Sequence, residues 1–327
     1  MTNFMKSVDE RTNLAGTNRL ELLLFSLGHD SHTGREEIFG INVFKVREVM
    51  SIPAITQAPD MPPSVAGMIS LRGNLIPVVN LAKFCDLHID EPAQIMIVTE
   101  YNKTMQGYMV HSVDTILRLD WNSVKTPPDM LSEQMGGVVT AVTELDDGRI
   151  VMIMDVEKVL ADTTHDTSSN NWFNDVKASE SRNVTIFFAD DSLVARKQIT
   201  RTLDHMGFTH VSANNGLEAW EKLKEIAQRA ETAQQPVANF VQLILTDVEM
   251  PEMDGFVLTK KIKADSRFDG IPVIMHSSLS ADSNQNLGKN VGADDYVPKF
   301  DPTHLSATIE KNISEAHSRT QKQLEQQ

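Results

Sequence analysis

The segment LILTDVEMPEMDG, residues 243–255, decides the fold of the C-terminal half of the chain. Its first residues are apolar or β-branched and lead directly into Asp247, and Pro251 and Gly255 then mark a turn. A continuous apolar run of this kind is typical of a strand that is buried on both faces of a parallel sheet. The helical pattern around Phe256–Ile262 completes one strand–helix unit of an α/β fold.

The same alternation of strands and helices continues on both sides of this segment. It predicts right-handed crossovers and therefore a parallel, doubly wound sheet. Gly207 follows one helical stretch and is expected to end that helix. The other expected strands are 184–189, 273–275 and 296–297, and the other expected helices are 192–206, 217–226 and a last helix from about Thr303.

Charged and hydroxyl side chains stand where the strands end. They are Asp190 and Asp191 after the strand at 184–189, Asp247 after the strand at 243–246, Ser277 after the strand at 273–275 and Lys299 after the strand at 296–297. Taken singly, each has an ordinary interpretation as a helix cap, a turn residue or a solvated charge. Because the carboxyl ends of parallel strands meet at one edge of the sheet, we expect the whole set to converge there.

The chemistry of this set follows from its charges. Three clustered carboxylates repel one another, so they stay ionised together only around a divalent cation, or else their pKa values rise. Oxygen ligands with room for water suit Mg²⁺, which also bridges to phosphate oxygens. An aspartate beside that ion is a candidate nucleophile toward phosphorus, and a lysine and a hydroxyl would neutralise the transferring group.

This half of the chain resembles the receiver domain of two-component response regulators. The resemblance rests on FFADDS at 187–192, LILTDVEMPEMDG at 243–255, PVIMHSS at 272–278 and DDYVPK at 294–299. It implies a flavodoxin-like α/β fold with a five-stranded parallel sheet over residues 184–315.

The resemblance also implies a role for each site residue. Asp247 would accept a phosphoryl group from a histidine kinase, with Mg²⁺ as the cofactor, and Lys299 would contact that group. Ser277 and Tyr296 would form the switch that responds to it. The implied Mg²⁺ ligands are the carboxylates of Asp190, Asp191 and Asp247 and the backbone carbonyl of Glu249. Because Glu249 lies two residues after the acceptor, we expect its carboxylate to alter the lifetime of the phosphoryl group.

Residues 19–162 carry a different pattern, of short apolar strands separated by turns. Many short strands at close spacing favour a β-sandwich or small barrels over a parallel sheet. Asp146-Asp147-Gly148 is a strong hairpin signal between the last two strands. The expected strands are Leu20–Leu27, Phe39–Met50, Gly67–Leu71, Asn74–Leu81, Gln94–Glu100, Met105–Val113, Val138–Leu145 and Arg149–Asp155.

The segment MISLRGNLIPVVNL at 68–81 places Arg72 at a tight turn between two apolar strands, which taken alone is an ordinary hairpin. Together with FGINVFKVREV at 39–49 and GYMVHSV at 107–113, it resembles the CheW-like coupling domains of chemotaxis. The resemblance implies two small five-stranded barrels that share an apolar seam.

That seam would take the helical tip of a methyl-accepting chemoreceptor, because a helix in an apolar groove is a common mode of recognition. Other surfaces of the domain would bind the histidine kinase CheA. The implied contact residues are Val46, Glu48 and Arg72, with Val110 and Val113 in the seam.

Polar segments are expected to lie outside the two domains. Trp172 and Phe173 are unusual in such a segment, and we expect them to pack against one of the domains. The expected segments are a flexible lead-in over 1–18, a linker over 163–183 and a polar tail over 316–327.

Composition narrows the partners and the compartment. The chain has 30 basic and 45 acidic residues, and its net charge of −15 disfavours nucleic acid and anionic membranes as partners. The lone cysteine, Cys85, cannot form an internal disulfide. No apolar run is long enough to span a bilayer, and the first residues lack the apolar core of a signal peptide. We therefore expect a cytoplasmic protein.

Together, the two resemblances predict a chemotaxis adaptor that links chemoreceptors to CheA at membrane-associated receptor arrays and is modulated by phosphorylation of Asp247. We expect an adaptor that takes part in phosphotransfer and is not mainly an enzyme. The alternative is a phosphate sink that drains phosphoryl groups from CheA, with the coupling domain only localising it. A hydrolase of the haloacid dehalogenase type is disfavoured, since Asp190 and Asp191 are adjacent and do not form its DxD motif.

Overall fold

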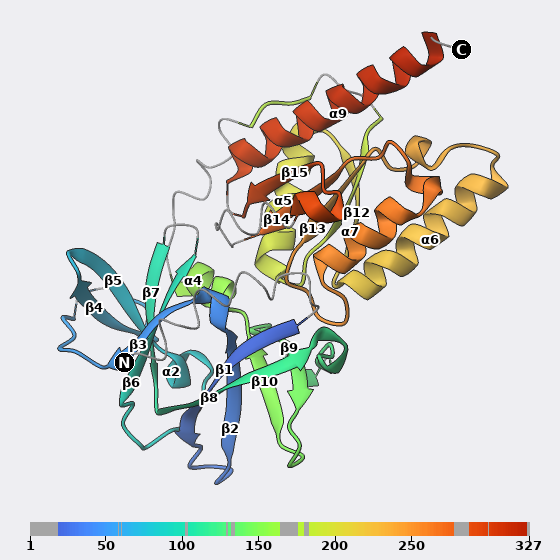
Figure 1. The fold of residues 1–327 in the computed structure, drawn as a ribbon. Helices are drawn as coiled ribbons and strands as arrows, with labels where there is room; N and C mark the ends of the chain where they lie inside the picture. Colours follow the sequence, from blue (N-terminus) through green and yellow to red (C-terminus); the bar gives the residue numbers. More distant parts are fainter. Residues whose placement is uncertain are drawn as a thin grey trace. The chain divides into compact units, whose positions relative to one another are not determined.

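Figure 1 shows the fold of the chain in a computed structural model. The structure describes residues 19–57, 59, 61–101, 104–128, 130–131, 135–163, 176–179, 183–277, 288–299 and 301–325. The expected lead-in over 1–18 and most of the expected linker, with Trp172 and Phe173, lie outside the described residues. The chain divides into two units, one over Leu20–Asp166 and the other over Thr167–Gln327.

The N-terminal unit contains two five-stranded β-sheets. The first has the order β8 (Ser112–Asp120), β1 (Arg19–His29), β2 (Glu36–Asn42), β10 (Ile150–Met154) and β9 (Val139–Glu144). The second has the order β3 (Val46–Ser51), β6 (Ile95–Tyr101), β7 (Thr104–Val110), β5 (Asn74–Asn80) and β4 (Val65–Leu71). The prediction of an all-β domain with two five-stranded parts is confirmed.

Each of these sheets closes on itself through a pair of backbone hydrogen bonds. In the chain after β3, Thr56 exchanges hydrogen bonds with Met68 of β4, at 2.9 and 2.8 Å. In the chain after β8, Lys125 exchanges hydrogen bonds with Val142 of β9, at 2.9 and 2.8 Å. Gly67 permits the first closure, since a Cβ there would lie 2.4 Å from the Thr56 carbonyl oxygen. The two edges of each sheet therefore meet, and each sheet forms a small barrel.

Two strands differ from the pattern expected from the sequence. The expected strand Phe39–Met50 is interrupted by the 3₁₀ turn η2 (Val43–Lys45), because the Asn42 side chain accepts a hydrogen bond from the N–H of Phe44 at 3.0 Å. The expected strand Met105–Val113 is also different, because β7 ends at Val110 and a separate strand, β8, begins at Ser112. Most of its side chains are exposed or half-buried, so its apolar alternation is weak in the sequence.

Two short helices follow strands of the N-terminal unit. α2 (Leu81–Phe84) follows β5, and α4 (Val156–Thr163) follows β10. Buried polar contacts hold α4: the Gln106 amide donates to the Thr163 hydroxyl at 2.8 Å, and the Tyr108 hydroxyl donates to the Val156 carbonyl at 3.2 Å. The last helix of the N-terminal unit is thereby fixed to β7.

The C-terminal unit is a sheet of five parallel strands in the order β12-β11-β13-β14-β15, with helices on both faces (Figure 1). The strands are β11 (Thr185–Ala189), β12 (Thr209–Ala213), β13 (Leu243–Asp247), β14 (Val273–Ser277) and β15 (Asp295–Pro298). The helices are α5 (Leu193–Met206), α6 (Gly216–Thr232), α7 (Gly255–Ala264), a short helix at 288–291 and α9 (Pro302–Glu325). The predicted doubly wound sheet is confirmed.

Two apolar layers hold the helices on this sheet. Phe187 and Phe188 are adjacent on β11 and point to opposite faces, as successive strand residues do. Phe187 packs in the layer beneath α6 and α7, which includes Leu223. Phe188 packs in the layer beneath α5 and α9, which includes Leu203. The sheet is therefore buried on both faces, and its carboxyl edge is left for the polar residues.

Parts of the expected linker and tail belong to the C-terminal unit. Val176 is buried in the layer beneath α5 and α9, and the N–H of Ser179 donates to the Met206 carbonyl at 3.0 Å. α9 continues to Glu325, through the segment expected as a tail from residue 316. This tail is rich in Gln, Lys and Glu, which favour helices, so its polarity does not stop the helix.

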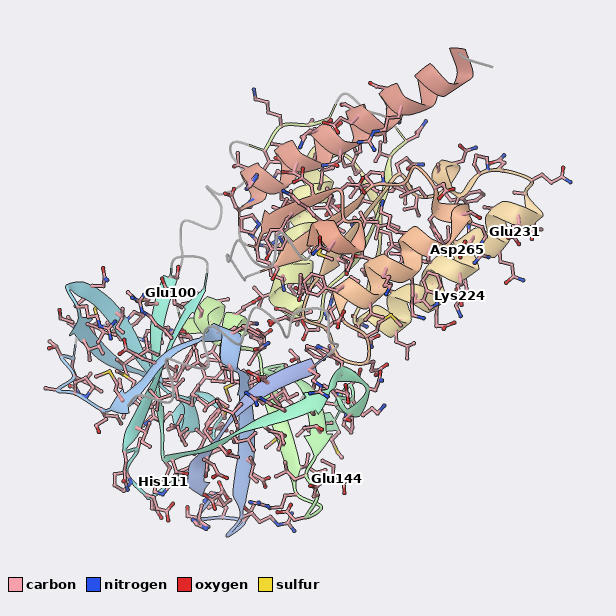
Figure 2. The ribbon with its side chains drawn as sticks, in the orientation of Figure 1. Glu100, His111, Glu144, Lys224, Glu231 and Asp265 are labelled. Atoms are coloured by element: carbon pink, nitrogen blue, oxygen red, sulfur yellow. The ribbon has the colours of Figure 1, made fainter. Side chains whose placement is uncertain are left out.

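Charged side chains project from the surface of each unit, as Glu144 and Glu231 do (Figure 2). Most of the net negative charge is accordingly solvated. None of the described helices is long and apolar enough to cross a membrane.

Candidate functional site

Asp190 and Asp191 follow β11 at the carboxyl edge of the sheet. Asp190 is completely buried and Asp191 is half-buried. One carboxylate oxygen of Asp190 accepts the N–H of Ser192 at 2.9 Å, and the Ser192 hydroxyl in turn caps α5. Nη1 of Arg196 donates to the backbone carbonyls of Asp190 and Asp191, both at 2.8 Å. The turn that carries the two acids is thus held from the first turn of α5.

Asp247 is the last residue of β13 and is 3% exposed. Its Oδ1 atom accepts the N–H of Val248 at 2.6 Å. The following loop folds back over the strand end, where the N–H of Gly255 donates to the Val248 carbonyl at 2.9 Å. A Cβ at Gly255 would lie 1.9 Å from the Asp247 carbonyl oxygen, so only glycine allows this approach. The glycine of the sequence MDG therefore allows the first residue of α7 to pack directly against the backbone of Asp247.

Lys299 follows β15 and reaches both buried acids. Its Nζ atom lies 2.8 Å from Oδ2 of Asp247 and 3.0 Å from Oδ2 of Asp190. Its backbone N–H donates to the Ser277 carbonyl at 3.0 Å, which ties the chain after β15 to the end of β14. The lysine side chain is only 2% exposed, and two carboxylates compensate for its lost hydration.

Ser277 and Tyr296 meet beside this cluster. Ser277 ends β14 and is buried, Tyr296 lies on β15 and is half-buried, and their side chains are hydrogen-bonded. Burial raises the pKa of the Tyr296 phenol to about 12, and the charges of Asp247 and Glu249 add to this effect. The phenol therefore stays neutral at physiological pH. Glu249 itself is half-buried.

The oxygen atoms of this cluster fit a divalent cation. One carboxylate oxygen each from Asp190, Asp191 and Asp247 can be chosen so that all lie within 4.8 Å of one another. Oxygen-only ligands of this kind, with space for water molecules, suit Mg²⁺. With three carboxylates against one lysine the site is negative, which also favours a cation. The backbone carbonyl of Glu249 stays a predicted ligand.

The structure thus brings together all the receiver residues that the sequence singled out. Arg196 and His276 were not among them. His276 lies on β14 next to Ser277, is 3% exposed, and places Nδ1 3.9 Å from Oδ2 of Asp190. A histidine directly after the apolar run PVIM and before Ser277 was the signal that could have found it. Arg196 follows Asp191 by five residues, and this spacing alone does not predict where its guanidinium points.

Two protein families match the chain. The CheW-like domain family matches residues 21–164, and the response regulator receiver domain family matches residues 186–310. Chemotaxis protein CheV3 of Helicobacter pylori is 30% identical over 299 residues, which cover 90% of this chain and 94% of CheV3.

The chain belongs to the CheV family.

A second CheV relative and one solved structure complete the comparison. Chemotaxis protein CheV2 of Helicobacter pylori is 27% identical over 326 residues, which cover 95% of this chain and 100% of CheV2. The scaffolding protein TtCheW from Thermoanaerobacter tengcongensis is 27% identical, with a TM-score of 0.37, and the match covers 42% of this chain and 84% of TtCheW. Both resemblances expected from the sequence are confirmed by the family matches.

The CheW-like domain of this CheV chain brings two of its predicted contact residues together. Glu48 on β3 and Arg72 at the β4–β5 turn form an ion pair of 2.9 Å, and the Arg72 side chain is 66% exposed. Val113 is half-buried. Val46 and Val110 are 4% and 1% exposed, so in this conformation they contribute to packing and offer little surface to a partner.

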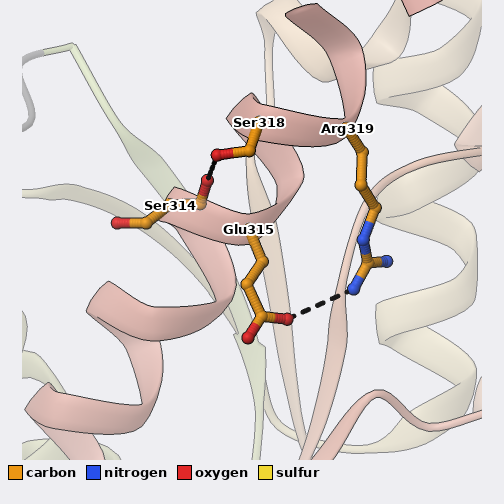
Figure 3. A pocket seen from close by; sticks show the side chains of 4 residues that line it. All are labelled: Ser314, Glu315, Ser318 and Arg319. Carbon is orange, nitrogen blue, oxygen red and sulfur yellow. Dashed lines mark hydrogen bonds and ion pairs between the residues drawn. The ribbon is translucent and has the colours of Figure 1, made fainter. Parts of the chain in front are cut away.

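One surface pocket of this CheV chain lies elsewhere in the receiver. It has a volume of about 390 Å³ and is lined by Ser314, Glu315, Ser318 and Arg319, all on α9 (Figure 3). Glu315 and Arg319 pair across it at 3.3 Å. None of the predicted site residues lines this pocket, so the acidic cluster at the carboxyl edge of the sheet is the better functional candidate.

Proposed function

We propose that this CheV protein is a chemotaxis adaptor that links chemoreceptors to the histidine kinase CheA and is regulated by phosphorylation of Asp247. One observation supports this most directly. In a chain that also carries a CheW-like domain, Asp247 lies at a sheet edge, 2.8 Å from a buried lysine and beside two further carboxylates. This is the set of groups that phosphoryl transfer to an aspartate requires.

In the proposed reaction, an oxygen of the Asp247 carboxylate attacks phosphorus of a phosphohistidine. An O–P bond forms as the N–P bond breaks, and the imidazole leaves with the electron pair. Lys299 supplies positive charge to the phosphoryl oxygens. Asp190, Asp191 and Asp247, with the carbonyl of Glu249, would hold Mg²⁺. When bound, Mg²⁺ neutralises part of the negative charge of the carboxylates and the phosphoryl group.

The response would pass through Ser277 and Tyr296. A phosphoryl group on Asp247 offers new acceptor oxygens near the Ser277 hydroxyl, which is hydrogen-bonded to Tyr296 in the present structure. Exchange of that partner frees Tyr296 to take a second position. Couplings between sites in such switches are typically about 1–3 kcal/mol, enough to retune kinase control without breaking the array.

The CheW-like domain would place the protein in the cytoplasm at membrane-associated receptor arrays. Glu48, Arg72 and Val113 are its accessible predicted contacts with CheA or the receptor tip. These contacts would bind partners without catalysing a reaction. In this proposal the protein is an adaptor, and its receiver is a substrate of the kinase.

Phosphotransfer from radiolabelled CheA tests the acceptor. The wild-type chain should become labelled in the presence of Mg²⁺, and Asp247→Asn should not. Asp269→Asn is the matched control, because Asp269 is an exposed aspartate of the same unit. Labelling of Asp247→Asn at the wild-type level would contradict the assignment.

Kinase activity in reconstituted receptor arrays separates the adaptor from the phosphate sink. An adaptor regulated through Asp247 should change receptor control of CheA when a phosphodonor is added, and Asp247→Asn should remove that change. A pure sink leaves coupling the same with and without phosphodonor, and only shortens the life of phosphorylated CheA.

A further inference from the structure

Arg196 stands in the first turn of α5 and reaches back to the backbone of both acids that follow β11. A single nitrogen, Nη1, donates to the carbonyl oxygens of Asp190 and Asp191, each at 2.8 Å. Both distances are those of good charge-assisted hydrogen bonds. The turn between β11 and α5 is therefore tied to the helix by a side chain that has no place in the phosphoryl transfer itself.

These hydrogen bonds act on residues that would ligate the cation. Asp190 has little freedom, because its Oδ1 accepts the N–H of Ser192 at 2.9 Å and its own N–H donates to the Ala213 carbonyl at 3.3 Å. Asp191 is half-buried and stands one residue further from the strand. Fixing the carbonyls of two consecutive residues fixes the peptide planes from which both carboxylates project.

The charge of Arg196 has the opposite expected effect. A guanidinium held against the backbone of the proposed ligands repels a divalent cation, and this repulsion lowers the affinity for the ion. If the charge of Arg196 dominates, a neutral side chain should raise the Mg²⁺ affinity. If the hydrogen bonds of Arg196 to the two carbonyls dominate, the same change should lower the Mg²⁺ affinity. A measured affinity therefore distinguishes the two effects.

We propose that Arg196 is a positioning residue for the divalent cation: through the carbonyls of Asp190 and Asp191 it holds their carboxylates ready to bind the ion. The inference rests on the proposed function and deepens it. Groups that orient metal ligands in this way typically contribute about 10–100-fold to metal affinity. For Arg196 this gain must exceed the loss that its charge causes.

Titration of the full-length, metal-free protein with MgCl₂ by isothermal calorimetry tests the proposal. Arg196→Met removes both hydrogen bonds and the charge, and should weaken Mg²⁺ binding by about tenfold or more. Arg196→Lys should restore most of the affinity, because one ammonium nitrogen can donate to both carbonyls from nearly the same place. Lys197→Met is the matched control: Lys197 is the next residue and is exposed, so its loss should leave binding equal or slightly tighter.

Several outcomes overturn the proposal. One is an Arg196→Met variant that binds Mg²⁺ as tightly as wild type or more tightly, because repulsion by the guanidinium charge would then outweigh any positioning of the ligands. Another is an Arg196→Lys variant no tighter than Arg196→Met. Thermal unfolding in EDTA identifies any variant that fails to fold, and Arg196→Gln, which keeps a polar side chain, then replaces Arg196→Met with the same expected loss.

This test is independent of the phosphorylation test. It uses no phosphodonor, so labelling of Asp247→Asn by CheA would overturn the proposed acceptor and leave the ranking of Mg²⁺ affinities intact. Conversely, equal affinities across the Arg196 variants would remove the positioning role while the Asp247 assignment stood.

Discussion

The Nζ atom of Lys299 lies 2.8 Å from Oδ2 of Asp247, with both side chains almost completely buried. A buried charge is tolerated only when another charge or several hydrogen bonds compensate for its lost hydration. The same nitrogen also lies 3.0 Å from Oδ2 of Asp190. Lys299 is therefore a structural part of the site as well as a group that would contact the phosphoryl oxygens.

Replacement of Lys299 by Met should destabilise the C-terminal unit in EDTA by about 3–5 kcal/mol, the usual effect of removing one member of a buried ion pair. MgCl₂ should recover part of the loss, because it supplies positive charge to the remaining carboxylates. Urea unfolding followed by circular dichroism measures both effects. Lys260→Met, at an exposed position of α7, is the control. Equal unfolding free energies of Lys299→Met and wild type in EDTA would contradict the idea that Lys299 compensates the buried carboxylates of Asp190 and Asp247.

Tyr296 should make stability depend on alkaline pH. Burial raises the pKa of its phenol from 10 to about 12, so between these values the folded state retains a proton that the unfolded state has lost. The contribution of this phenol to the free energy of unfolding is fully present below pH 10 and is lost as the pH rises toward 12. Denaturation at pH 9 to 11.5 should show a steeper decline for wild type than for Tyr296→Phe. Parallel declines would show that the phenol is not shielded.

Glu249 should influence how long the phosphoryl group survives. Its charge acts on the Tyr296 phenol, so it lies within electrostatic reach of the switch residues. A carboxylate there can orient an attacking water molecule or repel it, and the two effects change the hydrolysis rate in opposite directions. We expect autodephosphorylation of Glu249→Ala to differ from wild type by several-fold. Glu249→Gln separates the effect of charge from that of size, and equal rates in all three proteins would end the idea.

Arg72 should matter more for docking than for stability. Its side chain is 66% exposed, and exposed ion pairs such as Glu48–Arg72 are worth at most about 1 kcal/mol. Arg72→Met should therefore fold almost normally yet bind CheA more weakly, as pull-down from reconstituted arrays can show. Arg149→Met is the matched control, since Arg149 is 60% exposed and pairs with Asp147 in the same unit. Equal binding by the two variants would argue against a contact at Arg72.

The receiver half could be predicted from the sequence because its signals are local. Each buried strand reads as an apolar run, and each polar residue that ends one is fixed at the sheet edge by topology. β12 was not predicted as a strand, since this edge strand is partly exposed and reads THVSA. Arg196 and His276 were not predicted, because their contribution depends on where a side chain points in the folded chain, and the spacing of residues does not reveal this.

The barrels were harder to predict because their strands are short and their closure is not local. The interruption at η2 depends on a single Asn42 side chain that caps the turn. Burial of Val46 and Val110 depends on how the strands of the second barrel pair, and not on apolar character alone. Resemblance to a family supplies which positions correspond, but not which of them reach the surface.

Val176 has a practical consequence for isolating the receiver. The sequence places the first strand of that unit at 184, but Val176 is only 8% exposed within its apolar core and belongs with Val184, Phe208 and Leu305. A fragment that started at residue 184 would leave an empty space beneath α5 and lose the hydrogen bond from Ser179 to Met206. A receiver excised for crystallisation or spectroscopy should keep its chain from at least residue 176, or it will melt earlier than the same domain in the intact protein.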